Sequence, residues 1–486
     1  MAITIIQKPL YTLIPAGQEH IIFSVYDAAV ITANPAKHKI KYIADVYVGE
    51  QSTMLTASSN LVAKLKVTPN DMGYGMFDLS PIVANYLSAE YEGGQVSASG
   101  GGSFSFSEFK GVPYSDMAPH PIHLIDKFSG SRNSVRYVTV RFHIEYAETA
   151  TGEIDNIIQN LPAPDMIFFN GVLYDTDMYV NSINVGWFGY DITQDQLFPR
   201  NSICSLLTSA PTTQYIREND YATIPFFTEL DNAETGIYQG VAPLGAVQAV
   251  RAVRIEYFDI DAGSLGVTTH NLQLADGGHY GYIEDAFVKI QYWGVGTQNQ
   301  TNAGNPPPAN WSYYAVWLLD DQDNIITEKY TYYKQEESCK GYETVRLTWL
   351  NKWGTWDYYN FTQKNIRNIK TTRKAYKQLS GTWNKPYFQL SGHVGGMKNY
   401  NSTIKESITL NTDYITEEEA LWLEQLFISN DVYMLTDSPL SDVQTGTIRR
   451  YVQPVRITSE DMTRKTKAND KLIQYTFELE TNRTKK

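Results

Sequence analysis

The sequence predicts a mainly β protein: multi-domain β-sandwiches followed by a C-terminal strand–helix–hairpin domain. Short apolar runs that alternate with polar residues recur along the chain, and Gly, Pro, Asn or Asp bound each of them, which is typical of strands and their turns. The composition is also unusually aromatic, with 35 Tyr, 19 Phe and 9 Trp, and such residues favour strands. A length of 486 residues predicts about three domains, at roughly 150 residues each.

Residues 1–150 are expected to form an N-terminal β-sandwich with one short helix. The run Tyr42–Val48 is one of several strand-like segments that open this region. The helix is expected at Ser80, because its hydroxyl can accept a free first-turn N–H and the following Pro81 needs no N–H there. Apolar and polar residues alternate strictly over Arg136–Tyr146, which predicts a long strand with one polar face.

Residues 151–305 are expected to form a second β-rich domain. The dipeptide of Asn170 and Gly171 lies between apolar runs and predicts a β-hairpin, since it favours the turn that joins adjacent strands. A further strand is expected at Ala249–Phe258. The run Pro306–Pro308 excludes both helix and central strand, so we interpret it as part of a linker that ends this domain.

Residues 306–486 are expected to form a C-terminal β domain that contains the strongest helix signal of the chain. Thr416–Glu419 has the pattern of a capping box, in which the Thr and Glu side chains satisfy free N–H groups of the first turn. It predicts a helix over residues 416–430. The last strand alternates cleanly between two faces. Its expected inward residues are Ile473, Tyr475, Phe477 and Leu479.

Composition and charge argue against several classes of protein. Acidic residues outnumber basic residues by 53 to 40, and the net charge of -13 opposes general binding to DNA or to anionic membranes, so we expect no sequence-specific nucleic-acid contact. No apolar stretch reaches the length of a membrane span, and Met1–Pro9 has neither a basic segment nor a long apolar core. We therefore expect assembly in a cytoplasm, and we expect Cys204 and Cys339 to be buried thiols.

Sequence motifs for catalysis are absent, so we expect no enzyme, no cofactor and no metal. The sequence has no Gly-x-Ser-x-Gly elbow, no His-Glu-x-x-His and no phosphate loop. His120 and His123 form the only close histidine pair, for which a loop is favoured over a metal site. The acidic run Asp320–Asn324 lacks the Gly and distal Glu of an EF-hand loop, which favours a solvated hairpin turn over a calcium site. Carboxylates that folding brings together stay an open alternative, as in a polysaccharide-degrading enzyme.

An aromatic segment near residue 350 is the main candidate contact site. One interpretation is a sugar-stacking platform, because exposed Trp and Tyr faces bind the C–H surfaces of sugar rings. The other is packing in the core and between subunits, which is favoured because the side chains sort by strand parity onto two faces. The candidate interface or glycan-contact residues are Trp349, Trp353, Trp356, Tyr358 and Tyr359.

A basic run contrasts with the acidic character of the whole chain. It extends from Lys364 to Lys377 and includes Arg367, Lys370, Arg373 and Lys374. Such a run suits contact with an acidic neighbour, and an ordinary solvated loop is equally consistent with it.

Several phrases of the sequence resemble a known family. They are Asp45–Val48, Phe77–Leu87, Leu207–Pro211, Asp220–Thr223 and Trp349–Phe361. In phrasing and order they resemble tail structural proteins of tailed bacteriophages infecting Bacteroidetes-type hosts, over most of the chain. The closing order of strands, helix and terminal hairpin also resembles the belt or ring-forming domain of distal tail and baseplate hub proteins.

The resemblance implies a virion structural protein of a phage tail or baseplate, whose C-terminal domain makes the contacts of a ring around the tail axis. Its expected partners are copies of itself and other tail or baseplate proteins, and open sheet edges suit such closed assemblies. It would be located in the virion tail after assembly in the host cytoplasm. The alternatives are a glycan-binding receptor or adhesin module that touches a host surface glycan, and a ring adaptor near the portal.

Overall fold

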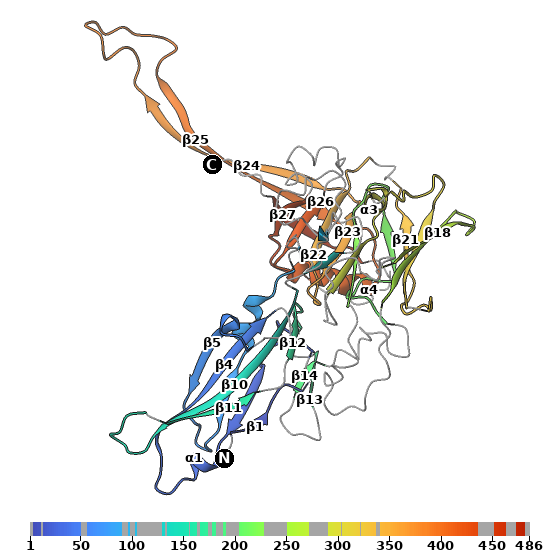
Figure 1. The fold of residues 1–486 in the computed structure, drawn as a ribbon. Coiled ribbons are helices and arrows are strands. Elements are labelled where there is room, and N and C mark those ends of the chain that lie inside the picture. Colours follow the sequence, from blue (N-terminus) through green and yellow to red (C-terminus); the bar gives the residue numbers. More distant parts are fainter. Residues whose placement is uncertain are drawn as a thin grey trace. The chain divides into compact units, whose positions relative to one another are not determined.

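The protein is mainly β with several sheets, as the sequence predicts (Figure 1). The chain divides into two compact units: unit 1 comprises Met1–Gln335 and Leu350–Asp357, and unit 2 comprises Glu336–Trp349 and Tyr358–Lys486. The computed structural model describes residues 3–10, 13–49, 56–89, 96–97, 103–104, 129–131, 134–154, 156–162, 166–173, 177–180, 188–190, 204–227, 250–271, 290–302, 304–320, 322–336, 341–435, 452–462 and 473–481.

This division differs from the expected boundaries at residues 150 and 305, because strands from either side of each boundary share a sheet. Strand β10 (Val135–Ala147) pairs with β12 (Met166–Phe169) across the first boundary. Strand β17 (Ala252–Phe258) pairs with β20 (Tyr313–Leu319) across the second. The proline run therefore lies between helix α3 (Thr297–Asn302) and β20 without ending a compact unit.

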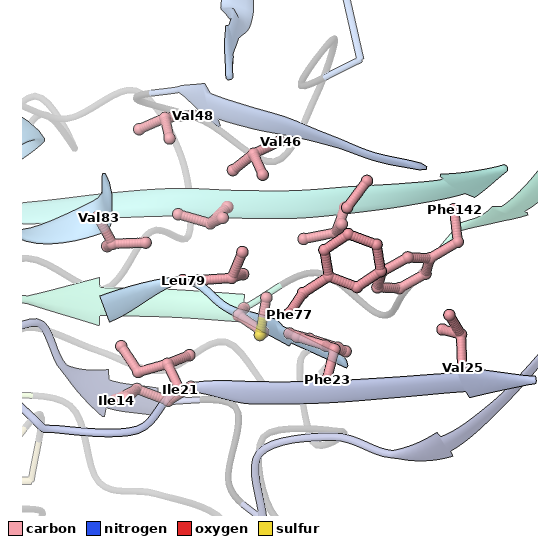
Figure 2. Packing of buried hydrophobic residues seen from close by; sticks show 14 of the residues in the cluster. Ile14, Ile21, Phe23, Val25, Val46, Val48, Phe77, Leu79, Val83 and Phe142 are labelled. Atoms are coloured by element: carbon pink, nitrogen blue, oxygen red, sulfur yellow. The ribbon is translucent and has the colours of Figure 1, made fainter. Parts of the chain in front are cut away.

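Unit 1 contains a β-sandwich close to its N-terminus. One sheet has the order β1–β3–β6, and the other has the order β2–β12–β10–β4–β5 with β11 beside β10. Phe23 and Phe77 from the first sheet meet Phe142 from the second, at ring-centroid distances of 5.5 and 5.6 Å (Figure 2). The remaining strands are β1 (Thr4–Gln7), β2 (Leu13–Pro15), β3 (Ile22–Tyr26), β4 (His38–Gly49), β5 (Leu61–Val67), β6 (Gly75–Asp78) and β11 (Asn156–Pro162), with helices α1 (Ala28–Ile31) and η1 (Ser58–Asn60).

The short helix expected at Ser80 is present, but its cap is different. Helix α2 (Ser80–Val83) begins with Ser80 as a helical residue and continues into the 3-10 turn η2 (Ala84–Tyr86). The Asp78 carboxylate accepts the backbone N–H of Ser80 at 2.9 Å. Asp78 therefore does what was expected of the Ser80 hydroxyl, since a carboxylate is the stronger acceptor.

Unit 1 also contains a second group of sheets. One has the order β15–β21–β20–β17–β18 and another has the order β16–β19–β9. The two sheets contact each other where His270 of β18 meets Trp293 of β19, with ring centroids 4.6 Å apart. The elements are β9 (Ser129–Ser131), β15 (Thr213–Ile216), β16 (Thr223–Phe227), β18 (Ser264–Asn271), β19 (Ile290–Gly294), α3 (Thr297–Asn302) and β21 (Tyr330–Lys334), with the ribbons β7 (Val96–Ser97) and β8 (Ser103–Phe104), and β13 (Met178–Val180) and β14 (Phe188–Tyr190).

A seven-stranded sheet and one helix form most of unit 2. The sheet order is β23–β22–β26–β27–β28–β25–β24. The helix expected over 416–430 is α4 (Glu417–Ile428), and the capping box between Thr416 and Glu419 is formed. All four expected inward residues of the last strand are buried. The strands are β22 (Val345–Leu350), β23 (Trp356–Phe361), β24 (Ile366–Gln378), β25 (Gly396–Asn411), β26 (Val432–Leu435), β27 (Val452–Ile457) and β28 (Thr476–Thr481).

Helix α4 packs on the inner side of this sheet through Trp422. The Trp422 ring lies 5.1 Å from Trp349 of β22 and 5.9 Å from Tyr359 of β23. Two residues after Tyr359, Phe361 meets Phe477 of β28 at 5.7 Å. Because alternate residues of a strand share a face, α4 and these rings lie on one side of the sheet.

Candidate functional site

The aromatic residues that the sequence singled out are mostly buried. Trp349, Trp353, Trp356 and Tyr358 are 0%, 2%, 4% and 7% exposed, and Tyr359 is half-buried. Burial also raises the pKa of the Tyr359 hydroxyl above its ordinary value. A sugar-stacking platform, the less favoured interpretation of the sequence, needs exposed ring faces that these residues do not offer. Their position is that of core residues, as the packing interpretation requires.

The turn between β22 and β23 is built around Asn351. Its side-chain oxygen accepts the backbone N–H groups of Trp353 at 2.9 Å and Thr355 at 3.1 Å, and its side-chain nitrogen donates to the carbonyl of Leu207 at 3.0 Å. Gly354 adopts a φ of +74°, and a Cβ there would lie 1.4 Å from the carbonyl oxygen of Asn170. The turn is therefore a packed structural element of unit 1.

The acidic run near residue 320 forms a turn, as favoured over a calcium site. Asp320 is 3% exposed, and its carboxylate accepts the backbone N–H groups of Gln322 at 2.9 Å and Asn324 at 2.8 Å. Burial alone would raise the pKa of Asp320, but hydrogen bonds from Asn324 and Gln322 hold it below its ordinary value. Within the described residues no group of three His, Cys, Asp or Glu could hold a metal ion.

The other expected groups are only partly described. The pair of His120 and His123 lies outside the described residues, as does Cys339. Cys204 is buried, and burial raises the pKa of its thiol to about 12. The expectation of a buried thiol is therefore confirmed for Cys204.

A long hairpin of β24 and β25 projects beyond the sheet of unit 2 (Figure 1). We call its residues 366–405 the arm. Strand β25 pairs with β28 only over Ser407–Asn411, and in the described residues the rest of β25 pairs with β24 alone. No residue of the arm is buried. Within the described residues, both faces and both edges of the arm are thus uncovered, although a lone two-stranded ribbon is at best marginally stable in water.

The arm is the basic part of an acidic protein. It contains eight Lys and Arg and no Asp or Glu, which leaves 32 bases and 53 acids, a net charge of -21, in the rest of the chain. At its base Arg367 pairs with Glu343 at 2.6 Å, and Lys405 pairs with Glu480 at 3.1 Å. The other six bases are exposed and form no ion pair with any described residue. They are Lys370, Arg373, Lys374, Lys377, Lys385 and Lys398.

The strand register sorts the arm side chains onto two faces. The inner face of the arm continues the side of β25 on which Ile408 and Leu410 are fully buried. Its residues are Ile369, Arg373, Lys377, Met397 and Ile404. On the opposite, outer face the rings of Tyr376 and Tyr400 lie 6.3 Å apart. The outer face also carries Lys370, Lys374, Lys398 and Lys405.

The tip of the arm is aromatic and exposed. Trp383 is 69% and Tyr387 is 82% exposed, and the Trp383 ring meets Phe388 edge-on at 5.3 Å. The Trp383 ring nitrogen donates to the carbonyl of Ser380 at 3.1 Å. Gly381 adopts a φ of +79°, which favours glycine. These exposed rings were not among the candidates from the sequence.

Sequence reasoning found the charge of the arm but not its structure. The basic run Lys364–Lys377 was interpreted as a loop or a contact with an acidic neighbour, and it forms strand β24. Polar or basic residues predominate on both faces of β24, so the strand lacks the alternation of a half-buried sheet. The available signal was β-branched and aromatic residues on both sides of the glycine pair Gly395 and Gly396.

Comparison with known proteins assigns no family. No family model matches the chain, and no curated protein matches it. It is similar to the trypsin-activated alpha-2-macroglobulin from Escherichia coli with 7% identity and a TM-score of 0.18, over 85% of this chain and 22% of that chain. The native conformation of the E. coli alpha-2-macroglobulin matches with 10% identity and a TM-score of 0.18, over 84% of this chain and 21% of that chain. The chain thus spans about a fifth of those chains, and a TM-score this low does not define a common fold.

Among the described residues, no helix is long and apolar enough to cross a membrane.

Proposed function

We propose that the chain is a virion structural protein of a phage tail or baseplate, and that its copies assemble into a ring around the tail axis. The observation that carries the assembly role is the arm, in which no residue is buried and most are exposed. The assignment to a phage tail rests on the sequence resemblance given above. Function of this kind is mechanical, and it needs no catalytic residue.

The arm supports assembly because an isolated protein gains little from building it. Exposed strand edges are templates for pairing, and soluble proteins usually cover or shorten them. The arm instead has two long strands, with apolar side chains such as Ile369 at 57% and Met397 at 69% exposed. A neighbour that covers these side chains removes apolar surface from water, which stabilises the assembly.

The charge of the arm favours a second copy of the chain as this neighbour. The basic arm of one copy is attracted to the acidic remainder of another, which has a net charge of -21, and this local attraction opposes the repulsion between two chains of net charge -13. A closed ring satisfies every arm, because each copy both donates an arm and receives one. Other tail or baseplate proteins would then bind the finished ring, and a ring adaptor near the portal is an alternative position for the same architecture.

The test is the mass of the full chain and of an arm-truncated variant in solution. Ile369 and Glu406 are cross-strand partners, so residues 370–405 can be replaced by an Asn-Gly turn without changing the register of the base. In sedimentation equilibrium we expect a discrete closed oligomer for the full chain and a monomer for the truncated variant. A full chain that stays monomeric at high concentration, or a truncated variant that still forms the oligomer, would contradict the proposal.

The exposed tip favours a second candidate function, which is binding of a host surface glycan. Trp383 and Tyr387 offer the exposed ring faces that the buried residues near position 350 do not. Under this alternative the full chain binds on a glycan array, and Trp383→Ala abolishes binding while the oligomer persists. Absence of binding by the full chain would remove this candidate and leave the assembly role untouched.

A further inference from the structure

We propose that the inner face of the arm binds the outward side of helix α4 on a second copy of the chain. This inference rests on the proposed assembly role and names the surface that receives the arm. The arm and α4 both belong to unit 2.

Helix α4 presents an apolar stripe between carboxylates on the side that faces away from the sheet. Leu421 and Ile428 are 48% and 49% exposed, and a spacing of seven residues places them on the same side of a helix. Glu417, Glu418 and Glu424 lie three or four positions from Leu421 and therefore flank it. We call these five residues the acidic face of α4.

The charges of the two surfaces are complementary. Residues 413–431 contain six Asp and Glu and no Lys or Arg. Glu417 and Glu418 are exposed and form no ion pair with any described residue, and the same holds for Arg373 and Lys377 on the inner face of the arm. Within the described part of the chain these four side chains have no ion-pair partner, and each of the two surfaces carries the charge opposite to the other.

The sheet shows which kind of element covers the inner face. In the body of unit 2, Ile408 and Leu410 lie on the side of the sheet that α4 covers. In the arm the same side continues as Ile369, Met397 and Ile404, and no described element covers it. A copy of α4 from a neighbour would repeat on the arm the sheet–helix packing that each chain already has in its body.

The arm is long enough to reach a neighbour. The 13 residues of β24 extend about 43 Å at roughly 3.3 Å per residue. A compact body of the size of unit 2 has a radius of gyration of about 14 Å. The far half of the arm therefore lies beyond the body from which it projects, where a second copy can contact it.

Two matched charge reversals on β24 test the face. Arg373→Glu with Lys377→Glu reverses two charges of the inner face, and Lys370→Glu with Lys374→Glu reverses two charges of the outer face on the same strand. In sedimentation experiments on the full chain we expect the inner reversal to weaken association by about tenfold or more, and the outer reversal by less than about threefold. Equal effects of the two reversals would overturn the assignment of the inner face.

Reversal on the helix, and its rescue, test the pairing. Glu417→Lys with Glu418→Lys should weaken association as much as the inner reversal does. A chain that carries both pairs of changes restores opposite charges across the contact, and we expect association within about threefold of the unchanged protein. If the helix reversal has no effect while arm truncation still yields a monomer, the assembly role holds and α4 is not the receiving surface.

Chemical cross-linking tests the same contact without substitutions. A carbodiimide joins a lysine amine directly to a carboxylate, so we expect a link from Lys377 to one of the glutamates of the acidic face. In a mixture of ¹⁵N-labelled and unlabelled chains, a contact between copies gives linked peptides of mixed label. If both peptides of every linked pair carried the same label, the link would lie within one chain, and the proposal would be overturned. The absence of any link between Lys377 and residues 417–424 would overturn it as well.

Discussion

Replacement of Trp422 by Ala tests whether the aromatic segment near residue 350 is a core or a binding platform. Trp422 is 3% exposed and contacts both Trp349 and Tyr359. Truncation to Ala removes about 150 Å² of buried apolar surface. This loss is worth about 4 kcal/mol at roughly 25 cal/mol/Å². The two ring contacts add about 1 kcal/mol, so the free energy of unfolding of unit 2 should fall by about 4–5 kcal/mol.

The assay is urea unfolding followed by circular dichroism, with hydrogen exchange of peptides from β22, β23 and α4. A loss of this size corresponds to a fall of roughly 12 °C in the unfolding temperature of a unit of this length. The nearby Tyr414→Ala is the control, because Tyr414 is 63% exposed and its replacement should change stability by about 0.5 kcal/mol or less. Equal urea midpoints for Trp422→Ala and Tyr414→Ala would refute the assignment of these rings to a core.

Three further predictions concern other parts of the fold. Thr416→Ala removes the side chain that accepts the N–H of Glu419 and should destabilise α4 by about 1 kcal/mol, whereas Thr416→Ser should not, as measured by urea unfolding. Gly354→Ala should lower the unfolding temperature sharply, since φ is +74° there and a Cβ would lie 1.4 Å from the Asn170 carbonyl oxygen. A loss of less than about 1 kcal/mol in the free energy of unfolding would contradict this. Burial raises the pKa of Tyr42 to about 12. This folded-state pKa lies above the unfolded value of about 10, so the protonated Tyr42 hydroxyl stabilises the fold fully below pH 10, and this stabilisation is lost as the pH rises towards 12. Tyr42→Phe cannot lose a proton there, so its urea midpoint should fall less over that interval than the midpoint of the unchanged protein.

Local signals predicted local structure well. The capping box at Thr416 and the alternation of the last strand involve residues close in sequence, and both are confirmed. The strand over Arg136–Tyr146 is present as β10, but its polar face is less exposed than expected. There Glu145 is 5% exposed and forms an ion pair with Lys66 of β5 at 2.8 Å. A strand two positions away in the sheet thus supplied a partner that alternation within β10 could not reveal.

Features that depend on distant segments were predicted poorly. Asn170 and Gly171 do not form the expected hairpin: β12 pairs with β10 and β2, and the N–H of Val172 donates to the carbonyl of Lys352 at 2.7 Å. A turn dipeptide permits a hairpin but cannot ensure that a strand follows it. The buried state of Trp353 and Trp356 likewise depends on contacts that no local pattern contains.

The candidate site was predicted only in its charge. The basic run Lys364–Lys377 was correctly set apart from the acidic chain, but the arm as a projecting ribbon was not foreseen. The helix and strand patterns used for prediction assume that one face of each element is buried in its own chain. A strand whose cover comes from elsewhere violates this assumption and leaves no periodic signal.

The way in which the arm joins its sheet has a mechanical consequence. Strand β25 runs without interruption from the arm into the body, where five of its residues pair with β28. Antiparallel hydrogen bonds lie perpendicular to the strands, so tension along the arm shears these bonds together instead of opening them one after another. The arm is thus anchored in the orientation that best resists a pull along its own axis.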